Sequence, residues 1–359
     1  IRRIMMDYKA ATLNIGRHTF ALYAMSGMLV LLIIASLAVG AVGISPVEVL
    51  ALFGNKMGLV ETVDATQSIV LFDIRLPRVL FTVCIGMALG MSGAALQGLF
   101  RNPLVEPGII GVSSGAAFGA VVVIIFIGGI APTLIDTLSS WLLPLFAFGG
   151  ALVATFFTLK IGNYEGRTKV TYVILAGVAV SAFASAIIGL SIFYADDQQL
   201  RTFTFWTLGD LSVATWDKLY ILFPIIGLSC VGLIKLAGPL NAMALGESEA
   251  FHSGVSVERV KLIIILLSAL VVGTSVAFAG IIGFIGLVVP HIVRVGLSPD
   301  HELVLPASAI GGAALLLAAD ILARTIVTPA ELPIGVVTAA IGTPFFIYLL
   351  INSKKKRLI

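Results

Sequence analysis

Ten long runs of mostly apolar residues follow one another along the 359-residue chain, and they decide what it can fold into. The runs cover roughly 18–44, 76–100, 109–128, 138–160, 169–194, 216–236, 257–278, 281–297, 304–326 and 333–352. A bilayer core is crossed by about 20 apolar residues in helical conformation. Because the runs are continuously apolar and do not alternate with polar residues, they predict spanning helices and not the strands of a barrel. We therefore expect an all-α polytopic membrane protein with about ten transmembrane helices, forming a single domain over 1–359.

The composition excludes several classes of protein. Charged residues make up 11% of the chain and hydrophobic residues 59%, whereas a soluble domain has about 25% charged residues. So few charges cannot cover a surface in water, which excludes a soluble enzyme and a disordered protein. Cys84 and Cys230 lie in apolar runs without metal-like spacing, so we expect no metal site and no covalently bound cofactor. We also expect no nucleic-acid partner, and, because the chain begins with Ile1, a true start further upstream.

Lys and Arg are divided unevenly between the two sides of the predicted bundle. An even number of spans puts both termini on one side, and that side receives 16 of the 22 Lys and Arg residues. Positive charge is concentrated in cytoplasmic loops of membrane proteins, so we expect both termini in the cytoplasm. The division gives formal charges of +8 inside and −5 outside. Arg75, Arg78 and Arg324 are exceptions on the acidic outer side.

The outer arginines occur in two short motifs. Arg75 and Arg78 flank the start of the second span in the sequence RLPR, where Pro suits the first helical turn. Asp320 and Arg324 are spaced i,i+4 near the end of the ninth span, which favours an ion pair on one helix face. One interpretation is a basic contact for an acidic partner outside the membrane. The alternatives are arginines that reach lipid headgroups and a purely structural pair.

The largest inner loop, about 237–256, contains a candidate docking element. Residues 244–254 predict a short helix with acids in its first turn and Gly254 just beyond its end. A compact, partly apolar helix of this kind is suited to docking a cytoplasmic protein, and the alternative is a solvated surface helix.

Internal similarities suggest how the spans pack. Gly86/Gly90 and Gly115/Gly119 have the small-xxx-small spacing that lets helix backbones approach closely. Ser92-Gly93 with Pro103 is echoed 187 residues later by Ala279-Gly280 with Pro290. We take this echo as a sign of inverted repeats with halves of about 76–194 and 257–352, an arrangement common in transporters.

The sequence lacks the elements that would supply energy for transport. There is no P-loop, no relay of carboxylates or His through the spans and no potassium-type filter. Either a separate subunit supplies the energy or, in a different class, the chain is a self-sufficient secondary transporter or channel.

Six stretches of the sequence resemble the FecCD family, the permease subunits of bacterial ABC importers for iron–siderophore complexes, haem and cobalamin. They are RLPR (75–78), SGAALQGLFRNPLVEPGIIGVSSGAAFGA (92–120), VILAGVAVSAFASA (173–186), ALGESEAFHSGV (244–255), AGIIGFIGLVVPHIVR (279–294) and LAADILARTIVTPAELPIGVVTAAIGTPFFIYLL (317–350). The resemblance implies a cobalamin-permease-like (type II ABC importer) fold with inverted repeats in the inner membrane. It also implies a homodimer whose pathway is lined largely by the fifth span.

The resemblance further implies the partners and their contact residues. Two cytoplasmic ABC ATPase subunits, which bind the ATP, dock on the inner loop, and a periplasmic binding protein docks outside. The implied coupling residues are Leu245, Gly246, Glu247, Glu249, Ala250, Phe251 and Gly254. The implied docking residues for the binding protein are Arg75, Arg78 and Arg324.

The segment 194–216 carries the information on substrate. Its sequence, YADDQQLRTFTFWTLGDLSVATW, is most similar to haem permeases, although Asp210 stands where the family often has Ser. The resemblance therefore implies haem as the transported substrate, delivered by a periplasmic haem-binding protein; a ferric siderophore or cobalamin is the alternative. Arg201 and Tyr194 suit the propionates of haem, and the neighbouring aromatic rings suit its flat apolar face. The candidate pathway residues are Tyr194, Arg201, Phe205, Trp206, Gly177 and Ser181.

Overall fold

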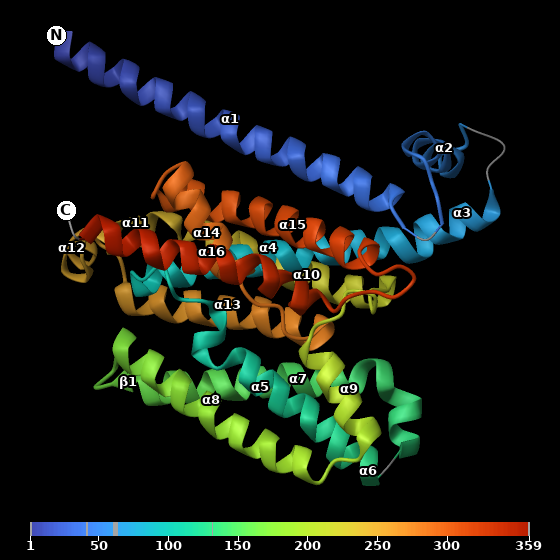
Figure 1. Ribbon diagram of the computed structural model, residues 1–359. Helices are drawn as coiled ribbons and strands as arrows, with labels where there is room; N and C mark the ends of the chain where they lie inside the picture. Colours follow the sequence, from blue (N-terminus) through green and yellow to red (C-terminus); the bar gives the residue numbers. More distant parts are fainter. Residues whose placement is uncertain (1, 41, 60–63, 131, 358–359) are drawn as a thin grey trace.

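The computed structural model describes residues 2–40, 42–59, 64–130 and 132–357, and it is almost entirely helical (Figure 1). The first half contains α1 (Arg2–Ala38), α2 (Pro46–Lys56), α3 (Ala65–Ile69), the π-helix η1 (Val70–Arg75), α4 (Leu76–Phe100), the 3-10 helix η2 (Pro107–Ile110), α5 (Val112–Val121), the π-helix η3 (Val122–Ile127), α6 (Gly128–Ile130), α7 (Pro132–Gly162) and the strands β1 (Asn163–Tyr164) and β2 (Arg167–Thr168). The second half contains α8 (Val170–Phe193), α9 (Asp197–Thr207), α10 (Trp216–Lys235), α11 (Ala237–Leu245), α12 (Glu247–His252), α13 (Val257–Ala279), α14 (Ile285–Gly296), α15 (His301–Thr325) and α16 (Ile334–Arg357).

The predicted spans are confirmed as helices. Seven described stretches are long and apolar enough to cross a membrane, and three shorter apolar helices correspond to the remaining runs. The seven are Thr19–Ala38, Ala65–Phe100, Trp141–Gly162, Val170–Phe193, Trp216–Lys235, Val257–Ala279 and His301–Thr325, and the three are Val112–Ile127, Ile285–Gly296 and Ile334–Tyr348. The predicted cytoplasmic location of the termini concerns Ile1 and Ile359, which lie outside the described residues.

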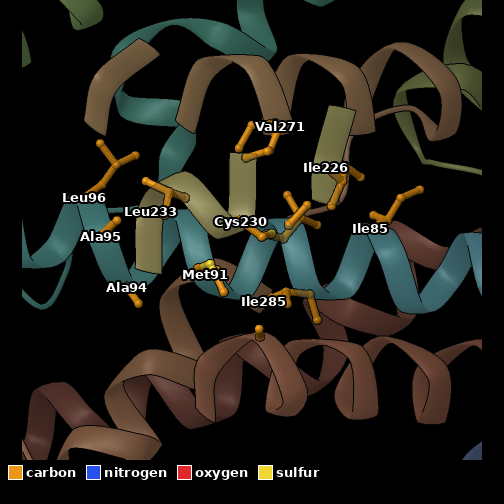
Figure 2. Packing of buried hydrophobic residues seen from close by; sticks show 14 of the residues in the cluster. Ile85, Met91, Ala94, Ala95, Leu96, Ile226, Cys230, Leu233, Val271 and Ile285 are labelled. Atoms are coloured by element: carbon orange, nitrogen blue, oxygen red, sulfur yellow. The ribbon is translucent and has the colours of Figure 1, made fainter. Parts of the chain in front are cut away.

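Helix α4 forms the centre of the bundle. Its side chains Ile85, Met91 and Leu96 are fully buried, which is the environment expected for a span that is apolar all round. Figure 2 shows this helix between residues of α10 (Ile226, Cys230 and Leu233), Val271 of α13 and Ile285 of α14. Surrounded in this way, α4 contacts protein on all sides.

Small residues allow the closest helix contacts, as their spacing predicted. A Cβ atom added at Gly90 would lie 2.1 Å from the carbonyl oxygen of Ser308, so α4 and α15 touch backbone to backbone. A Cβ atom added at Gly119 would lie 2.0 Å from the carbonyl oxygen of Phe146, which joins α5 to α7 in the same way. Van der Waals packing of this kind stabilises helix pairs in a membrane, where burial of apolar surface gives little driving force.

The two ends of the bundle carry different short elements. At one end, on the right in Figure 1, lie α2, α3, α6 and α9, and we refer to it as the outer end. At the opposite end lie α11, α12 and the β1–β2 hairpin, and we refer to it as the inner end. Helix α2 follows Ser45, and Ser45 and Glu48 form a reciprocal capping box at its start.

Candidate functional site

At the outer end, Arg75 is buried and bound to the end of α1. Its side chain donates hydrogen bonds to the carbonyl oxygens of Leu37 at 2.8 Å, Ala38 at 2.9 Å and Val42. Carbonyls at a helix C-terminus lack partners within the helix, and a guanidinium group satisfies several of them at once. Arg75 is 4% exposed, so its guanidinium has little surface to present to another protein.

Arg78, one helical turn further along, is held by two carboxylates. Its Nε and Nη2 atoms lie 3.1 and 2.8 Å from Asp320 Oδ1, and Nη1 and Nη2 lie 3.0 and 2.8 Å from the two oxygens of Glu331. Sequence reasoning identified Arg78 but missed Glu331, because 253 residues separate the two. The Arg78 side chain is 12% exposed.

Arg324 completes the group that we call the outer charge cluster, namely Arg78, Asp320, Arg324 and Glu331. The predicted i,i+4 ion pair is present, with 3.1 Å between Arg324 Nε and Asp320 Oδ2. The other arm of Arg324 donates to Ser36 Oγ at 2.8 Å and to the carbonyl oxygen of Val39 at 3.2 Å. Arg324 and Arg75 therefore both attach the end of α1 to the bundle.

A cavity of about 350 Å³ opens beside the cluster, and we call it the outer cavity. Its lining joins Arg78, Asp320 and Glu331 to Phe205 and Trp206 of α9. The start of α16 closes one wall, because Gly335 N donates to the carbonyl oxygen of Leu208 at 2.8 Å. The structure thus brings one predicted docking residue and two predicted pathway residues to a single cavity, a grouping that the sequence did not indicate.

The remaining predicted pathway residues, Tyr194, Arg201, Gly177 and Ser181, do not line this cavity. Arg201 and Phe205 share the exposed face of α9, with the guanidinium carbon 5.7 Å from the ring centroid. Tyr194 is exposed at the end of α8, and its ring meets Phe193 at 5.3 Å. A Cβ atom at Gly177 would lie 2.0 Å from the carbonyl oxygen of Ile109, so Gly177 is packed against η2, and Ser181, one turn along α8, is half-buried.

At the inner end, α11 and α12 build a projecting corner. Leu245 and Phe251 are 81% and 70% exposed, while Ala250 is fully buried beneath them. Gly246, with φ of 156°, joins the two helices in a conformation that side chains oppose. Gly254 has φ of 91° directly after the end of α12, as its position predicted.

Lys261 holds this corner to the rest of the protein. Its ammonium lies 2.7 Å from Glu247 Oε2 of α12 and 3.0 Å from Glu258 Oε1 on its own helix, and it donates to the carbonyl oxygen of Thr168 at 3.0 Å. Glu258 Oε2 in turn accepts from the Thr168 backbone N–H at 2.7 Å. The predicted coupling residue Glu247 therefore connects, through Lys261, to α13 and to the hairpin.

A cavity of about 660 Å³ lies between these parts, lined by Arg167, Glu247, Phe251, Glu258 and Arg259 among others. Positively and negatively charged side chains both line this cavity, together with the exposed ring of Phe251. Such a surface is suited to a protein partner with a mixed polar and apolar contact. Sequence reasoning missed Lys261 and the hairpin, because only the fold brings them to α12.

Glu106, between α4 and α5, is another residue that the sequence did not single out. Burial raises the pKa of its carboxyl above the usual range, although a hydrogen bond from the Phe284 backbone N–H opposes the shift. Phe284 has φ of 67°, an unusual conformation for a bulky residue, and it begins α14. The Glu106 carboxyl therefore stabilises the non-helical segment between α13 and α14 through its hydrogen bond with Phe284.

Across the part of the chain that the structure describes, no three His, Cys, Asp or Glu residues are grouped so as to hold a metal ion. What the arrangement offers is a membrane-embedded bundle with an internally paired charge cluster and cavity at one end and a projecting helical corner at the other.

The sequence and the structure were compared with known proteins, and the matches agree on one family. The model of the FecCD transport family matches residues 28–352. The chain is 41% identical to the hemin transport system permease protein HmuU of Yersinia pestis, over 92% of this chain and 96% of that protein. It is 39% identical to the vitamin B12 import system permease protein BtuC of Klebsiella pneumoniae, over 82% and 86%. A solved metal-chelate type ABC transporter in an inward-facing conformation superposes with a TM-score of 0.80, at 32% identity over 92% of this chain and 98% of that one.

These matches cover nearly all of the described bundle, and they agree with the fold that the apolar runs predicted. Of the two classes that the sequence left open, the matches support a permease component of an ABC importer and not a self-sufficient secondary transporter. The chain belongs to the FecCD transport family.

Proposed function

We propose that this chain is the permease that moves haem from a periplasmic haem-binding protein across the inner membrane into the cytoplasm. The observation that supports haem as the substrate is the 41% identity to a hemin permease over 92% of the chain. The segment around α9 supports it, since Arg201 and Phe205 present a cation and a ring on one exposed face. Propionate groups suit the guanidinium, and the macrocycle suits the aromatic rings.

The permease acts as a homodimer with two cytoplasmic ATPase subunits, which bind and hydrolyse ATP, and both of its termini lie in the cytoplasm. Its two halves, about 76–194 and 257–352, are inverted repeats of a single domain. The pathway lies between the two copies, with Gly177 and Ser181 on the span α8 beside it and Tyr194, Arg201, Phe205 and Trp206 near its outer mouth. Exposed apolar side chains along α8, among them Phe183 and Leu190, favour a helical partner there.

The test of the substrate is ATP hydrolysis by the permease–ATPase complex in lipid nanodiscs. Haem-loaded binding protein is expected to stimulate hydrolysis, and the Arg201→Ala variant is expected to lower haem uptake while ATPase assembly persists. Stimulation by a siderophore-loaded partner and none by the haem-loaded one would refute haem as the substrate.

Cobalamin is the second candidate, and the 39% identity to BtuC favours it. The same assay distinguishes the two, because each binding protein is supplied with its own ligand. Stimulation by a cobalamin-loaded partner alone would replace haem with cobalamin and leave the rest of the proposal in place.

The ATPases dock on the inner corner formed by α11 and α12, through Leu245, Gly246, Glu247, Glu249, Ala250, Phe251 and Gly254. The exposed Leu245 and Phe251 support this assignment, since apolar side chains that project from a charged loop are typical of a contact surface. Leu245→Ala with Phe251→Ala is expected to reduce ATPase co-purification severalfold. Leu228→Ala on α10, which removes an equally exposed leucine from a membrane span, is the control and should leave assembly unchanged. Full assembly of the double variant would contradict this role.

The binding protein docks at the outer end around Arg75, Arg78 and Arg324. The contrast between these arginines and the acidic outer loops supports the assignment. Charge reversal at Arg75 and Arg78 together is expected to weaken docking, and the wild-type affinity should fall as salt rises. Unchanged affinity of the double variant would remove the arginines from the docking face.

A further inference from the structure

The three arginines proposed to meet an acidic partner already have acceptors within the chain. Arg75 donates to three backbone carbonyls near the end of α1, and Arg324 donates to Ser36 and Val39 and pairs with Asp320. Arg78 is shared between Asp320 and Glu331. A carboxylate from another protein can therefore bind one of these guanidinium groups in full only by taking the place of an acceptor that is already there.

The acceptors differ in how freely they can leave. The Asp320 side chain is 1% exposed and is also paired with Arg324, and the carbonyls belong to the backbone. The Glu331 side chain is 42% exposed and lies in the segment between α15 and α16. Leu332 N donates to the carbonyl oxygen of Ala323 at 3.0 Å, which fixes the backbone next to Glu331. The Glu331 side chain can therefore turn away while the segment stays in place.

The pair between Arg78 and Glu331 has the form of a contact between two proteins. Both oxygens of the carboxylate meet the guanidinium, Oε1 at 3.0 Å from Nη1 and Oε2 at 2.8 Å from Nη2. Such two-pronged pairing is how arginine recognises carboxylates at interfaces. The outer cavity, about 350 Å³ and lined by both residues, gives an incoming side chain room beside them.

We propose that Glu331 is an internal substitute for the partner's carboxylate. It occupies Arg78 while the permease is free, and an acidic side chain of the substrate-delivering protein displaces it on docking. This exchange rests on the proposed function, which supplies that partner. Because one arginine–carboxylate pair replaces another, Arg78 is never left unpaired, and the return of Glu331 assists release of the emptied partner.

The test measures the affinity of the haem-loaded binding protein for the permease–ATPase complex in nanodiscs by surface plasmon resonance. Glu331→Gln keeps the side-chain shape and removes the competing charge, so it is expected to tighten binding about two- to fivefold, mainly through slower dissociation. Asp217→Asn removes the same charge from the exposed first turn of α10, and none of the ion pairs among the described residues involves Asp217. It should leave the affinity unchanged. Unchanged or weaker binding by Glu331→Gln, or equal tightening by Asp217→Asn, would overturn the exchange.

A second pair of variants separates this inference from the docking face itself. Arg78→Ala should weaken docking, and adding Glu331→Gln to it should then give no further tightening, because the substitute acts through Arg78. If Arg78→Ala weakens docking but Glu331→Gln alone has no effect, only the exchange is wrong. If Arg78→Ala leaves docking unchanged, the docking face is wrong and the exchange with it. If the alanine variant does not fold, Arg78→Lys takes its place in this test. It keeps the positive charge but loses the two-pronged hydrogen bonding of the guanidinium group.

Discussion

Asp320 is buried between two guanidinium groups and is the centre of the outer charge cluster. One oxygen accepts from Arg78 at 2.8 and 3.1 Å, and the other lies 3.1 Å from Arg324 Nε. Removing one member of a buried ion pair leaves the other charge without compensation, which is far more destabilising than losing an exposed pair. The stability of the outer end therefore depends on this single carboxylate.

Asp320→Asn tests this dependence. Loss of the charge leaves Arg78 with Glu331 alone and Arg324 without a carboxylate, so the unfolding free energy in detergent micelles is expected to fall by about 3 kcal/mol. Asp217→Asn, at an exposed position of the same end, should change it by less than about 0.5 kcal/mol. Equal stability of the two variants would show that the arginines do not need Asp320.

Glu106 predicts a dependence of stability on pH. Its pKa is raised in the folded protein, so the ionised form is disfavoured there and stability is lost as pH rises through the folded pKa. Glu106→Gln removes this loss and keeps an oxygen for the Phe284 N–H. The variant should therefore unfold at a higher temperature than the wild type at about pH 8, and the difference should vanish towards about pH 4. A constant difference across this range would contradict the shift.

At the residue scale, the sequence predicted local relations and missed distant ones. Asp320 and Arg324 were found because one helical turn separates them. Glu331 was missed because it reaches Arg78 across 253 residues. Glu106 and Lys261 were not singled out either, since only the fold brings Phe284 and Thr168 beside them.

At the scale of elements, two neighbouring glycines of α7 allow a matched test of helix packing. A Cβ atom at Gly150 would lie 2.1 Å from the carbonyl oxygen of Gly115, whereas one at Gly149 would have nothing within 4 Å. Gly150→Ala is expected to destabilise the protein by about 1–3 kcal/mol through overpacking of α5 against α7. Gly149→Ala should be neutral or stabilising by up to about 1 kcal/mol, because alanine favours helix. Thermal unfolding of both variants in one detergent provides the measurement, and equal losses would contradict the packing.

The number and kind of the spans followed from the sequence, because apolar length alone decides them in lipid. The places where the helices are interrupted could not be predicted from the apolar pattern. The run 281–297 forms a helix only over Ile285–Gly296, since Gly280 at φ 72° and Phe284 at φ 67° turn the chain before it. The π-helical segments η1 and η3 also lack any signal in the apolar pattern.

At the scale of the whole molecule, the proposed homodimer predicts which surface meets a second copy. The exposed residue Phe183 of α8 should lie near its own symmetry mate, because an interface with twofold symmetry brings the same patch of both copies together. Phe183→Cys is expected to form a disulfide-linked dimer in native membranes upon mild oxidation. Leu228→Cys on the exposed face of α10 should not, and the native Cys84 and Cys230 can remain because both are buried. Crosslinking at 228 and none at 183 would place the interface elsewhere.

The sequence predicted the sparse arginines and the short loop helix on opposite sides, and the structure has them at opposite ends of the bundle. Apart from the Asp320–Arg324 pair, the sequence did not indicate that the outer arginines have partners within the chain, since backbone carbonyls of α1 carry no sequence signal. The outer cavity was also beyond prediction, because α9, α13, α15 and the start of α16 meet there only in the folded chain.

Helix α13 touches both ends of the bundle. Near its first turn, Lys261 is bonded to the inner corner through Glu247, and at its last turn the carbonyl oxygen of Ala279 accepts from Asp210 N at 2.8 Å beside the outer cavity. Its 23 residues span about 34 Å as one unbroken helix. One continuous helix therefore connects the residues of the inner corner to the backbone beside the outer cavity.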